Sequence, residues 1–130
     1  MALTFTAPSD DIIFQEGVAA YNFQASGNIL AGQLVYPKDT MKVAAVNAAD
    51  KTDIIGVAGY DVTDDEYVAV WGPGNIVRCK SSGAITVGQV LNGSVNGHVY
   101  YDPAGVTAGA KVGIALESVA TNTQVKVLLV

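Results

Sequence analysis

The sequence predicts an all-β domain made of two similar β units that close on one shared core. A short phrase occurs twice: residues 26–35 and 82–91 carry Ser, Gly, Ile, Gly and Gln at matching places, offset by 82 − 26 = 56. Apolar residues elsewhere alternate with a period near two rather than 3.6, which favours strands over helices. Half of the 130 residues are hydrophobic and 14 are glycine, a mix that suits strands joined by tight turns.

A second pair of similar segments supports the duplication. Ile55-Gly56-Val57-Ala58 resembles Val112-Gly113-Ile114-Ala115, at an offset of 112 − 55 = 57 residues. Periods of this length are typical of a duplicated supersecondary unit, and two copies are too few for a solenoid. We therefore expect one β domain over residues 12–130, with an internal repeat covering roughly 26–80 and 82–130, preceded by an arm over residues 1–11.

The predicted arm contains the alternating run Leu3-Thr4-Phe5-Thr6, which Pro8 and the two following aspartates end. A short alternating tail can add a strand to an exposed sheet edge of a partner. It can equally be a frayed terminus or an edge strand of the same barrel.

In the first unit, strands are predicted at residues 12–14, 18–23, 34–36, 41–46, 54–60 and 67–71. Pro37 is expected to end the third of these, and residues 47–53 to form a polar loop. The run 54–60 is apolar and bounded by turn residues, so it is expected to be buried. The acidic stretch 61–66 is expected to be a turn.

Gly72-Pro73-Gly74-Asn75 predicts a turn that joins 67–71 and 76–80 in a hairpin at the end of the first unit. The second unit repeats this plan. The pairs Asn92-Gly93 and Asn96-Gly97 predict further turns. Strands are predicted at residues 85–91, 98–101, 111–116 and 124–130.

Composition excludes several functions. The net charge is −5, from 7 Lys and Arg against 12 Asp and Glu, so no basic footprint for nucleic acid is expected. No apolar run approaches the roughly 20 residues that a membrane helix needs. Cys79 is the only cysteine, so no intramolecular disulfide can form. The N-terminus lacks the basic region of a secretory signal.

Residues for chemistry are sparse. His98 and Cys79 each stand alone, which argues against a zinc site within the chain. The acidic turn lacks the spacing of a calcium-binding loop, and no phosphate-binding loop occurs, so no metal and no cofactor are expected. Cys79 lies between Arg78 and Lys80, which could lower its pKa, but a cysteine on a strand is more often a small buried hydrophobe. We do not expect an enzyme.

Five aromatic residues are candidates for an interface, where Trp and Tyr are enriched. They are Tyr60, Tyr67, Trp71, Tyr100 and Tyr101. They could equally fill the core. Tyr100 and Tyr101 are adjacent, so a strand would direct them to opposite faces and one of the pair would point outward.

Together these motifs resemble a known family. The matching segments are Ile55-Gly56-Val57-Ala58-Gly59-Tyr60, Val68-Ala69-Val70-Trp71-Gly72-Pro73-Gly74, Ser82-Gly83-Ala84-Ile85-Thr86-Val87-Gly88-Gln89-Val90-Leu91, Lys111-Val112-Gly113-Ile114-Ala115-Leu116-Glu117 and Val125-Lys126-Val127-Leu128-Leu129. Over roughly residues 26–130 the pattern is similar to that of the small capsid decoration proteins (cement, or head-stabilising, proteins) of tailed bacteriophages and related viruses. It is a pattern of glycines and strands, not a catalytic signature.

The resemblance implies a compact β-tulip or β-barrel-like domain with an extended N-terminal arm. It implies a structural virion protein, made in the host cytoplasm, that sits on the capsid exterior as homotrimers at threefold or quasi-threefold positions. The implied partners are the major capsid protein and further copies of the chain, with no nucleic acid and no membrane. Leu3, Thr4, Phe5 and Thr6 would bind the capsid by their position in the arm.

One alternative is a carbohydrate-binding or receptor-binding β module of a virion fibre. It would need Trp71 and the Tyr100-Tyr101 pair to converge on one groove.

Overall fold

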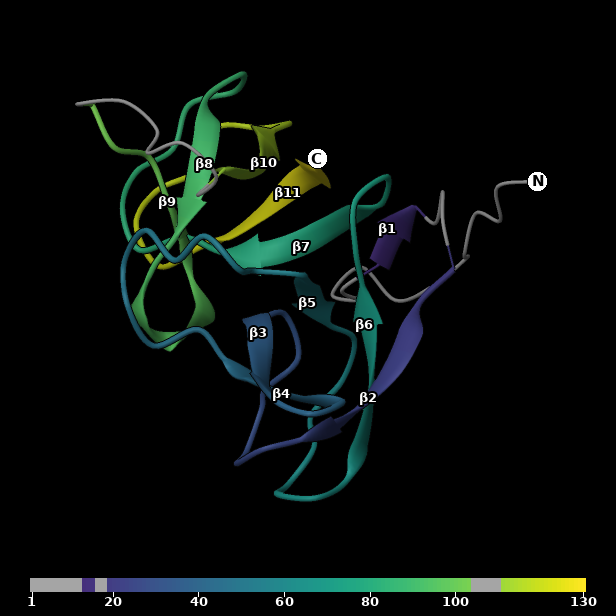
Figure 1. The fold of residues 1–130 in the computed structure, drawn as a ribbon. Coiled ribbons are helices and arrows are strands. Elements are labelled where there is room, and N and C mark those ends of the chain that lie inside the picture. The colour runs from purple at the N-terminus through teal and green to yellow at the C-terminus, as the bar shows by residue number, and fades with distance from the viewer. Residues whose placement is uncertain (1–12, 16–18, 104–110) are drawn as a thin grey trace.

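The protein is all-β apart from one turn of 3-10 helix (Figure 1). The computed structural model describes residues 13–15, 19–103 and 111–130, so the predicted arm lies outside the described residues. The elements are β1 (Ile13–Gln15), β2 (Tyr21–Ala25), β3 (Leu34–Asp39), β4 (Lys42–Ala45), β5 (Gly56–Ala58), β6 (Tyr67–Trp71), β7 (Ile76–Lys80), β8 (Val90–Gly93), η1 (Val95–Gly97), β9 (Val99–Tyr100), β10 (Lys111–Ala115) and β11 (Gln124–Leu129). The predicted all-β, barrel-like fold class is confirmed.

The first unit closes into a small barrel in the order β2-β4-β3-β5-β6. β2 runs parallel to β4, and the other neighbours in the barrel are antiparallel. Alternation along β6 directs Val68 and Val70 inward and Tyr67 and Trp71 outward. The inward side chains form the first core cluster: Ala25, Ile29, Val35, Val43, Ala58, Val62, Val68 and Val70.

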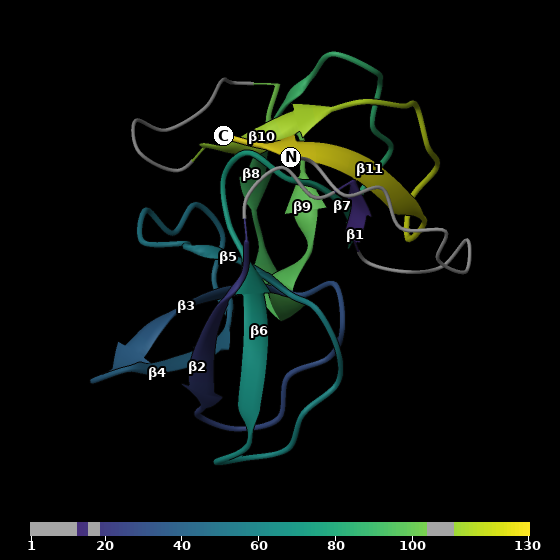
Figure 2. The same ribbon diagram turned by 90° about the vertical axis from the view of Figure 1, so that its right-hand side faces the viewer.

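The second sheet is open, in the order β1-β7-β11-β10-β8-β9, and lies against the barrel (Figure 2). It combines the strands of the second unit with β1 and β7, which precede that unit in the chain. Its inner face packs on the outer wall of the barrel, where Leu34, Val57 and the half-buried Trp71 meet it. This second core cluster comprises Leu34, Tyr36, Val46, Val57, Val77, Cys79, Ile85, Leu91, Val99, Val112, Ala115, Val125, Val127 and Leu129.

One core cluster is therefore shared between the barrel and the sheet, as expected, and the barrel has a second core of its own. The reason is the difference in closure between the units. Only the first unit closes on itself, and it fills its interior with its own side chains. The second remains open and has to bury one face against its neighbour, as a sheet with a hydrophobic face must.

The two copies of the repeated phrase form the same turn. The Gly32 N–H donates to the Ala58 carbonyl at 2.9 Å, and the Gly88 N–H donates to the Ala115 carbonyl at 2.8 Å. Both glycines have positive φ, +88° and +89°, which a residue with a Cβ rarely adopts. The glutamine after each glycine then closes the turn, because its side-chain oxygen accepts from the backbone N–H three residues earlier.

Isolated β-bridges also occur at equivalent positions in the two units. Ile29 pairs with Val62 in the first unit, and Ile85 pairs with Val119 in the second. The offsets of these partners, 85 − 29 = 56 and 119 − 62 = 57, equal those found in the sequence. The same local hydrogen bonds thus serve a closed barrel in one unit and an open sheet in the other.

Three local predictions are wrong. β6 and β7 do not form a hairpin: β6 pairs with β2 and β5, and β7 pairs with β1 and β11, so both edges of each strand are occupied. Residues 72–75 instead connect the barrel to the sheet.

Asn92 and Gly93 do not form the predicted turn, because they belong to β8 and are buried. β3 continues through Pro37 to Asp39, because β5 pairs only with its first residues and leaves an edge where a missing N–H costs little.

A polar junction pins the loop after β4 to the second sheet. One carboxylate oxygen of Asp50 accepts from the Asn92 side-chain amide and from the Tyr100 hydroxyl, both at 2.7 Å. The Asp50 N–H also donates to the Gly93 carbonyl at 3.1 Å. Asn92 is fully buried, so its amide depends on this carboxylate. Asp50 thereby fixes the two units to each other.

We expect Asp50→Gly to lower the free energy of unfolding by about 3 kcal/mol, because two charge-assisted hydrogen bonds are lost and the buried amide of Asn92 loses its acceptor. Glycine tolerates the positive φ of Asp50, +59°, so backbone strain does not add to the loss. Urea unfolding measures the change. The matched control is Asp53→Gly, which removes only a 3.8 Å ion pair to Lys51 and should cost about 1 kcal/mol or less. Equal losses in the two variants would contradict the role of Asp50.

Candidate interaction surfaces

The predicted capsid-binding residues, Leu3, Thr4, Phe5 and Thr6, lie outside the described residues. The surfaces described below are therefore those of the barrel and the sheet.

Two of the predicted aromatic residues lie on the outside of the barrel. Tyr60 is 48% exposed, and its hydroxyl donates to the Tyr67 carbonyl at 3.4 Å. Trp71 is half-buried and packs against the second core cluster. Its indole nitrogen lies 2.8 Å from the place where a Cβ on Gly59 would be, so the missing side chain of Gly59 gives the indole its position.

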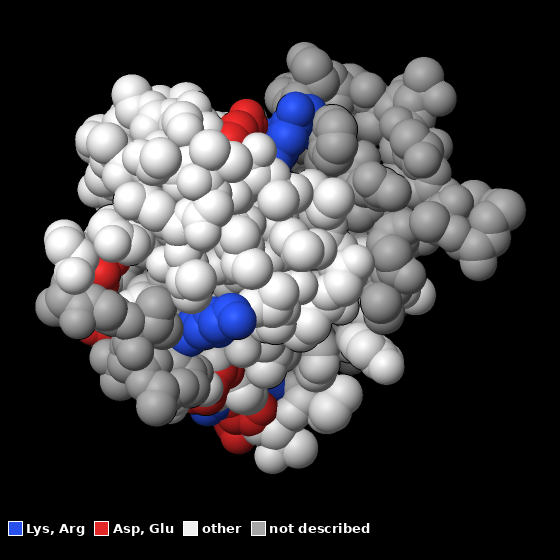
Figure 3. Space-filling model, turned by 90° about the horizontal axis from the view of Figure 1, so that it is seen from above, with Lys and Arg blue, Asp and Glu red and all other residues white. Residues whose placement is uncertain are grey.

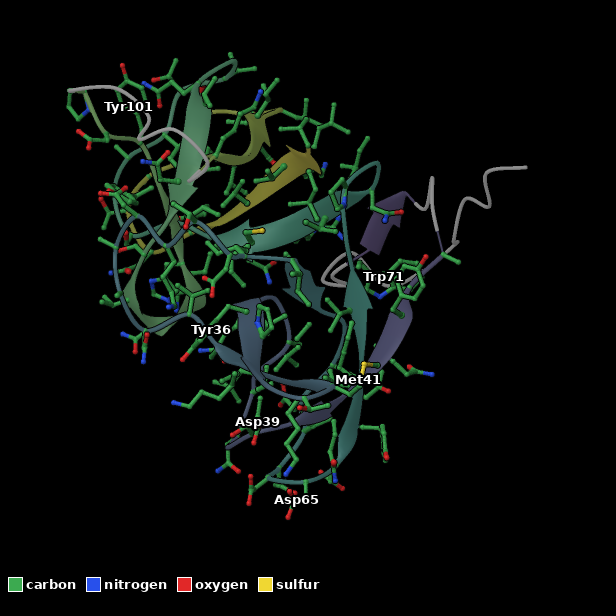
Figure 4. All side chains as sticks on the ribbon, viewed as in Figure 1. Tyr36, Asp39, Met41, Asp65, Trp71 and Tyr101 are labelled. Carbon is green, nitrogen blue, oxygen red and sulfur yellow. The ribbon has the colours of Figure 1, made fainter. Side chains whose placement is uncertain are left out.

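Tyr100 and Tyr101 lie at the far end of the sheet. Tyr100 is half-buried and bonded to Asp50, and this hydrogen bond, together with burial, raises the pKa of the Tyr100 hydroxyl. Tyr101 is 39% exposed, so one member of the pair does face outward. Figure 4 places Trp71 and Tyr101 on opposite sides of the molecule. The structure does not bring Trp71 and the tyrosine pair together on one groove.

Tyr67, also a candidate from the sequence, is 65% exposed. Two further exposed side chains were not singled out from the sequence: Tyr21 and Met41, which are 72% and 66% exposed. Met41 lies at the tip of the β3–β4 hairpin, which projects from the barrel in Figure 2. Its φ of +54° is uncommon for a residue other than glycine. No sequence signal marked the hairpin as projecting.

Two of the hollows lined by described residues differ in chemistry. One, of about 270 Å³, lies at the mouth of the barrel and is apolar; it is lined by Ala19, Tyr21, Phe23, Ile55, Val70, Gly72 and Pro73. The other, of about 500 Å³, is more open and is rich in side-chain amides; it is lined by Asn28, Leu30, Gln33, Ala45, Val46, Asn47, Val95 and Asn96. The first suits an apolar side chain, and the second suits a polar ligand with hydrogen-bonding groups.

The surroundings of Cys79 and His98 do not make their side chains more reactive. Cys79 is 1% exposed, and burial raises its pKa to about 12, so the thiol is protonated at neutral pH and the suggested lowering by Arg78 and Lys80 is wrong. Burial, and then the charge of Lys80, lower the pKa of His98. Within the described ranges, no group of three or more His, Cys, Asp or Glu could hold a metal ion.

The acidic stretch 61–66 is a turn, as expected, and its carboxylates cap neighbouring backbone. Asp64 accepts from the Gly27 N–H at 2.6 Å, and Asp61 accepts from the Ala31 N–H at 2.7 Å. Hydrogen bonds from the backbone and hydroxyl of Thr63 lower the pKa of Glu66. Figure 4 shows Asp65 at the end of the barrel remote from the sheet. These carboxylates already have protein donors, which accounts for the turn without a bound cation.

Among the described residues, no helix has the length and hydrophobicity required to cross a membrane.

No family model matches the chain, and no curated protein matches it. Among solved structures, however, the fold is shared with part of a bacteriophage head fiber. The matching structure is the N base of head fiber gp8.5 of bacteriophage phi29, with a TM-score of 0.68 and 18% sequence identity over 85% of this chain and 92% of that chain. At this identity the likeness shows a common fold. The matched protein is a head fiber and not a decoration protein.

Proposed function

We propose that this chain is a structural virion protein that decorates the outside of a bacteriophage capsid. It stabilises the shell by bridging neighbouring major capsid subunits, as homotrimers at threefold or quasi-threefold sites. The observation that carries the proposal is the fold shared with the N base of a phage head fiber over most of both chains. The sequence resemblance to decoration proteins supports the same setting.

The physical basis is linkage. A protein that binds only the assembled shell stabilises that shell, because opening it would forfeit the binding free energy. Tyr and Met side chains are enriched in the cores of protein interfaces. The exposed Tyr21, Tyr60, Tyr67 and Met41 on the barrel suit a surface that meets another protein.

A non-enzymatic role without a cofactor fits the described residues. Cys79 is buried with a raised pKa, and the described titratable side chains form no metal-binding group. The acidic turn caps the backbone. A binding role, in contrast, requires only surface and stability.

The test is co-sedimentation of the purified protein with capsids before and after expansion. We expect saturable binding to expanded shells, and a rise in the temperature at which the decorated shells open. Binding to neither form would refute the proposal. Binding to both forms with no change in opening temperature would leave the protein on the capsid but refute stabilisation.

A receptor-binding or carbohydrate-binding module of a fibre is the second candidate. Two observations favour it: the matched structure is part of a head fiber, and the chain has an amide-rich hollow. The amides of this hollow belong to Asn28, Gln33, Asn47 and Asn96. A glycan array separates the two roles. A specific hit that Asn47→Ala abolishes, without capsid binding, would favour this second role.

A further inference from the structure

Two Asn-Gly pairs in the sequence are chemically alike but have different surroundings in the structure. An asparagine before glycine loses its side-chain amide readily, because glycine has no Cβ to keep the following backbone nitrogen away from the asparagine Cγ. Asn92-Gly93 lies within β8, and Asn92 is fully buried with its amide bonded to Asp50 at 2.7 Å. Asn96-Gly97 lies in η1, and Asn96 is exposed. The fold therefore distinguishes the two pairs.

η1 is the loop of the β8–β9 hairpin, which reaches across to the first unit (Figure 1). The Gly97 N–H donates to the Val46 carbonyl at 2.9 Å, and the Gln33 side-chain amide donates to the Asn96 carbonyl at 2.9 Å. A Cβ on Gly97 would lie 2.7 Å from the Gln33 Cβ and 2.9 Å from the Leu34 nitrogen, so the turn is tightly packed at this point. These contacts dock η1 on the first unit.

The docked turn does not have the conformation in which the amide of Asn96 can be lost. The Gly97 nitrogen has to bond to the Asn96 Cγ and close a five-membered ring. Such a ring is nearly planar, so the bond from the Asn96 carbonyl carbon to the Gly97 nitrogen must eclipse the Cα–Cβ bond of Asn96. The ψ of Asn96 is 21°, far from that arrangement, and the N–H of Gly97 is bonded to Val46. The reaction therefore requires η1 to undock.

η1 can undock without opening the sheet. Its base is closed by the Ser94 N–H, which donates to the His98 carbonyl at 2.8 Å, so the hairpin keeps its own hydrogen bonds. Exposed loops open at a lower free energy than core strands do. Asn92, in contrast, is paired with Lys111 of β10 on one side and with Tyr100 of β9 on the other. It becomes accessible only when β8 loses its neighbours.

We propose that Asn96 is a site of spontaneous deamidation that is gated by the undocking of η1, and that the fold protects Asn92. In the undocked turn, the Gly97 nitrogen gives up its proton and attacks the Asn96 Cγ. A C–N bond forms, the bond from Cγ to Nδ2 breaks, and the amide nitrogen takes up a proton and leaves as ammonia. Water then opens the resulting succinimide. Opening at Cγ gives aspartate, and opening at the backbone carbonyl carbon gives isoaspartate.

The modification changes both the fit and the charge of the turn. In isoaspartate the main chain runs through Cγ and is longer by a carbon atom, so the hydrogen bonds of η1 to Val46 and Gln33 no longer fit together. Charged side chains are sparse on the described surface in Figure 3, and the net charge is only −5. One further carboxylate, −5 − 1 = −6, therefore separates modified from unmodified protein by anion exchange.

Incubation of the purified protein at mildly alkaline pH tests the proposal. Anion exchange gives the total extent of modification, and mass-spectrometric fragmentation of the chymotryptic peptide 92–100 assigns it to either asparagine. We expect Asn96 in the folded protein to react at least about 10-fold faster than Asn92, because local opening is more frequent than global unfolding. We also expect it to react at least about 10-fold more slowly than in guanidinium chloride, where both pairs should react at similar rates.

Gln33→Ala removes the hydrogen bond to the Asn96 carbonyl and is expected to speed the reaction at Asn96 about 5-fold, the factor that corresponds to one hydrogen bond. Gln89→Ala is the matched control. Gln33 and Gln89 close equivalent turns by accepting from the backbone N–H of Leu30 and of Thr86. The control loses only this turn-closing bond and should leave the rate at Asn96 unchanged.

Equal rates at Asn96 and Asn92 in the folded wild type would overturn the proposal, because both would then require global unfolding. A rate at Asn96 equal to that in denaturant would also overturn it, by showing that docking gives no protection. Both comparisons use the wild type alone, so they decide the matter even if Gln33→Ala fails to fold. No capsid is present, so the result is independent of binding to shells.

Discussion

Gly56→Val and Gly113→Val are each expected to lower the melting temperature by on the order of 10 °C, from a loss of at least about 3 kcal/mol. A Cβ at Gly56 would overlap the carbonyl oxygen of Trp71 on the neighbouring strand, and one at Gly113 would overlap that of Leu128. Side chains block the remaining space, with Val70 Cγ1 at 2.9 Å and Val127 Cγ1 at 2.6 Å. A backbone carbonyl in a ladder cannot move aside as the end of a flexible side chain can.

Thermal unfolding followed by circular dichroism measures the effect. The matched control is Gly83→Ala, because Gly83 has nothing within 4 Å of an added Cβ. We expect this control to unfold within about 2 °C of the wild type, since surface changes away from such contacts stay within about 0.5 kcal/mol. Wild-type melting temperatures in both valine variants would show that the repeated glycines have no packing role.

Deleting residues 2–11 is expected to reduce capsid binding by at least about 100-fold, a loss of about 2.7 kcal/mol, while the remaining domain still unfolds cooperatively. The described members of the barrel core and of the cluster beneath the sheet all come from residues 25–129. An extended arm, in contrast, supplies main-chain hydrogen bonds and apolar contacts to a partner. Binding isotherms on expanded capsids give the affinity, and thermal unfolding gives the stability.

Point substitutions refine this deletion. Leu3→Asp with Phe5→Asp should weaken binding about as much as the deletion, because both apolar positions of the alternating run are lost. Thr4→Ser with Thr6→Ser keeps the length and the hydroxyl groups and serves as the control. A truncated protein that decorated shells at full occupancy would refute the capsid-binding role of the arm.

Local signals predicted the strands well where neighbouring residues decide the structure. The bounds of β6 and β7 agree with the sequence prediction, because alternation with valine marks one and Gly72 to Asn75 separates them. The turn at Gly32 was predicted, whereas its counterpart at Gly88 was missed, because residues 85–91 were predicted as a strand and β8 begins only at Val90. Alternation, however, predicts that a strand has two different faces without saying what covers each face.

The candidate surfaces were predicted less completely. The sequence identified Tyr60 and Tyr101 as candidates, and both are exposed, but Tyr100 is bonded to Asp50, fifty residues away in the chain. Met41 projects from the barrel because β3 and β4 stay paired as far as Asp39, whereas β5 pairs only with Leu34 and Val35 at the start of β3. Such contacts join distant parts of the chain and leave no local pattern.

The sequence by itself determined an all-β chain with a duplicated unit and with glycine where a turn or a close strand requires it. These features depend on φ preferences and on a period of two, which act over a few residues. Only the tertiary structure decided that one unit closes into a barrel while the other stays open, and that β6 and β7 pair with different partners. Strand pairing joins residues far apart in the chain, and nearly identical local turns are compatible with either outcome.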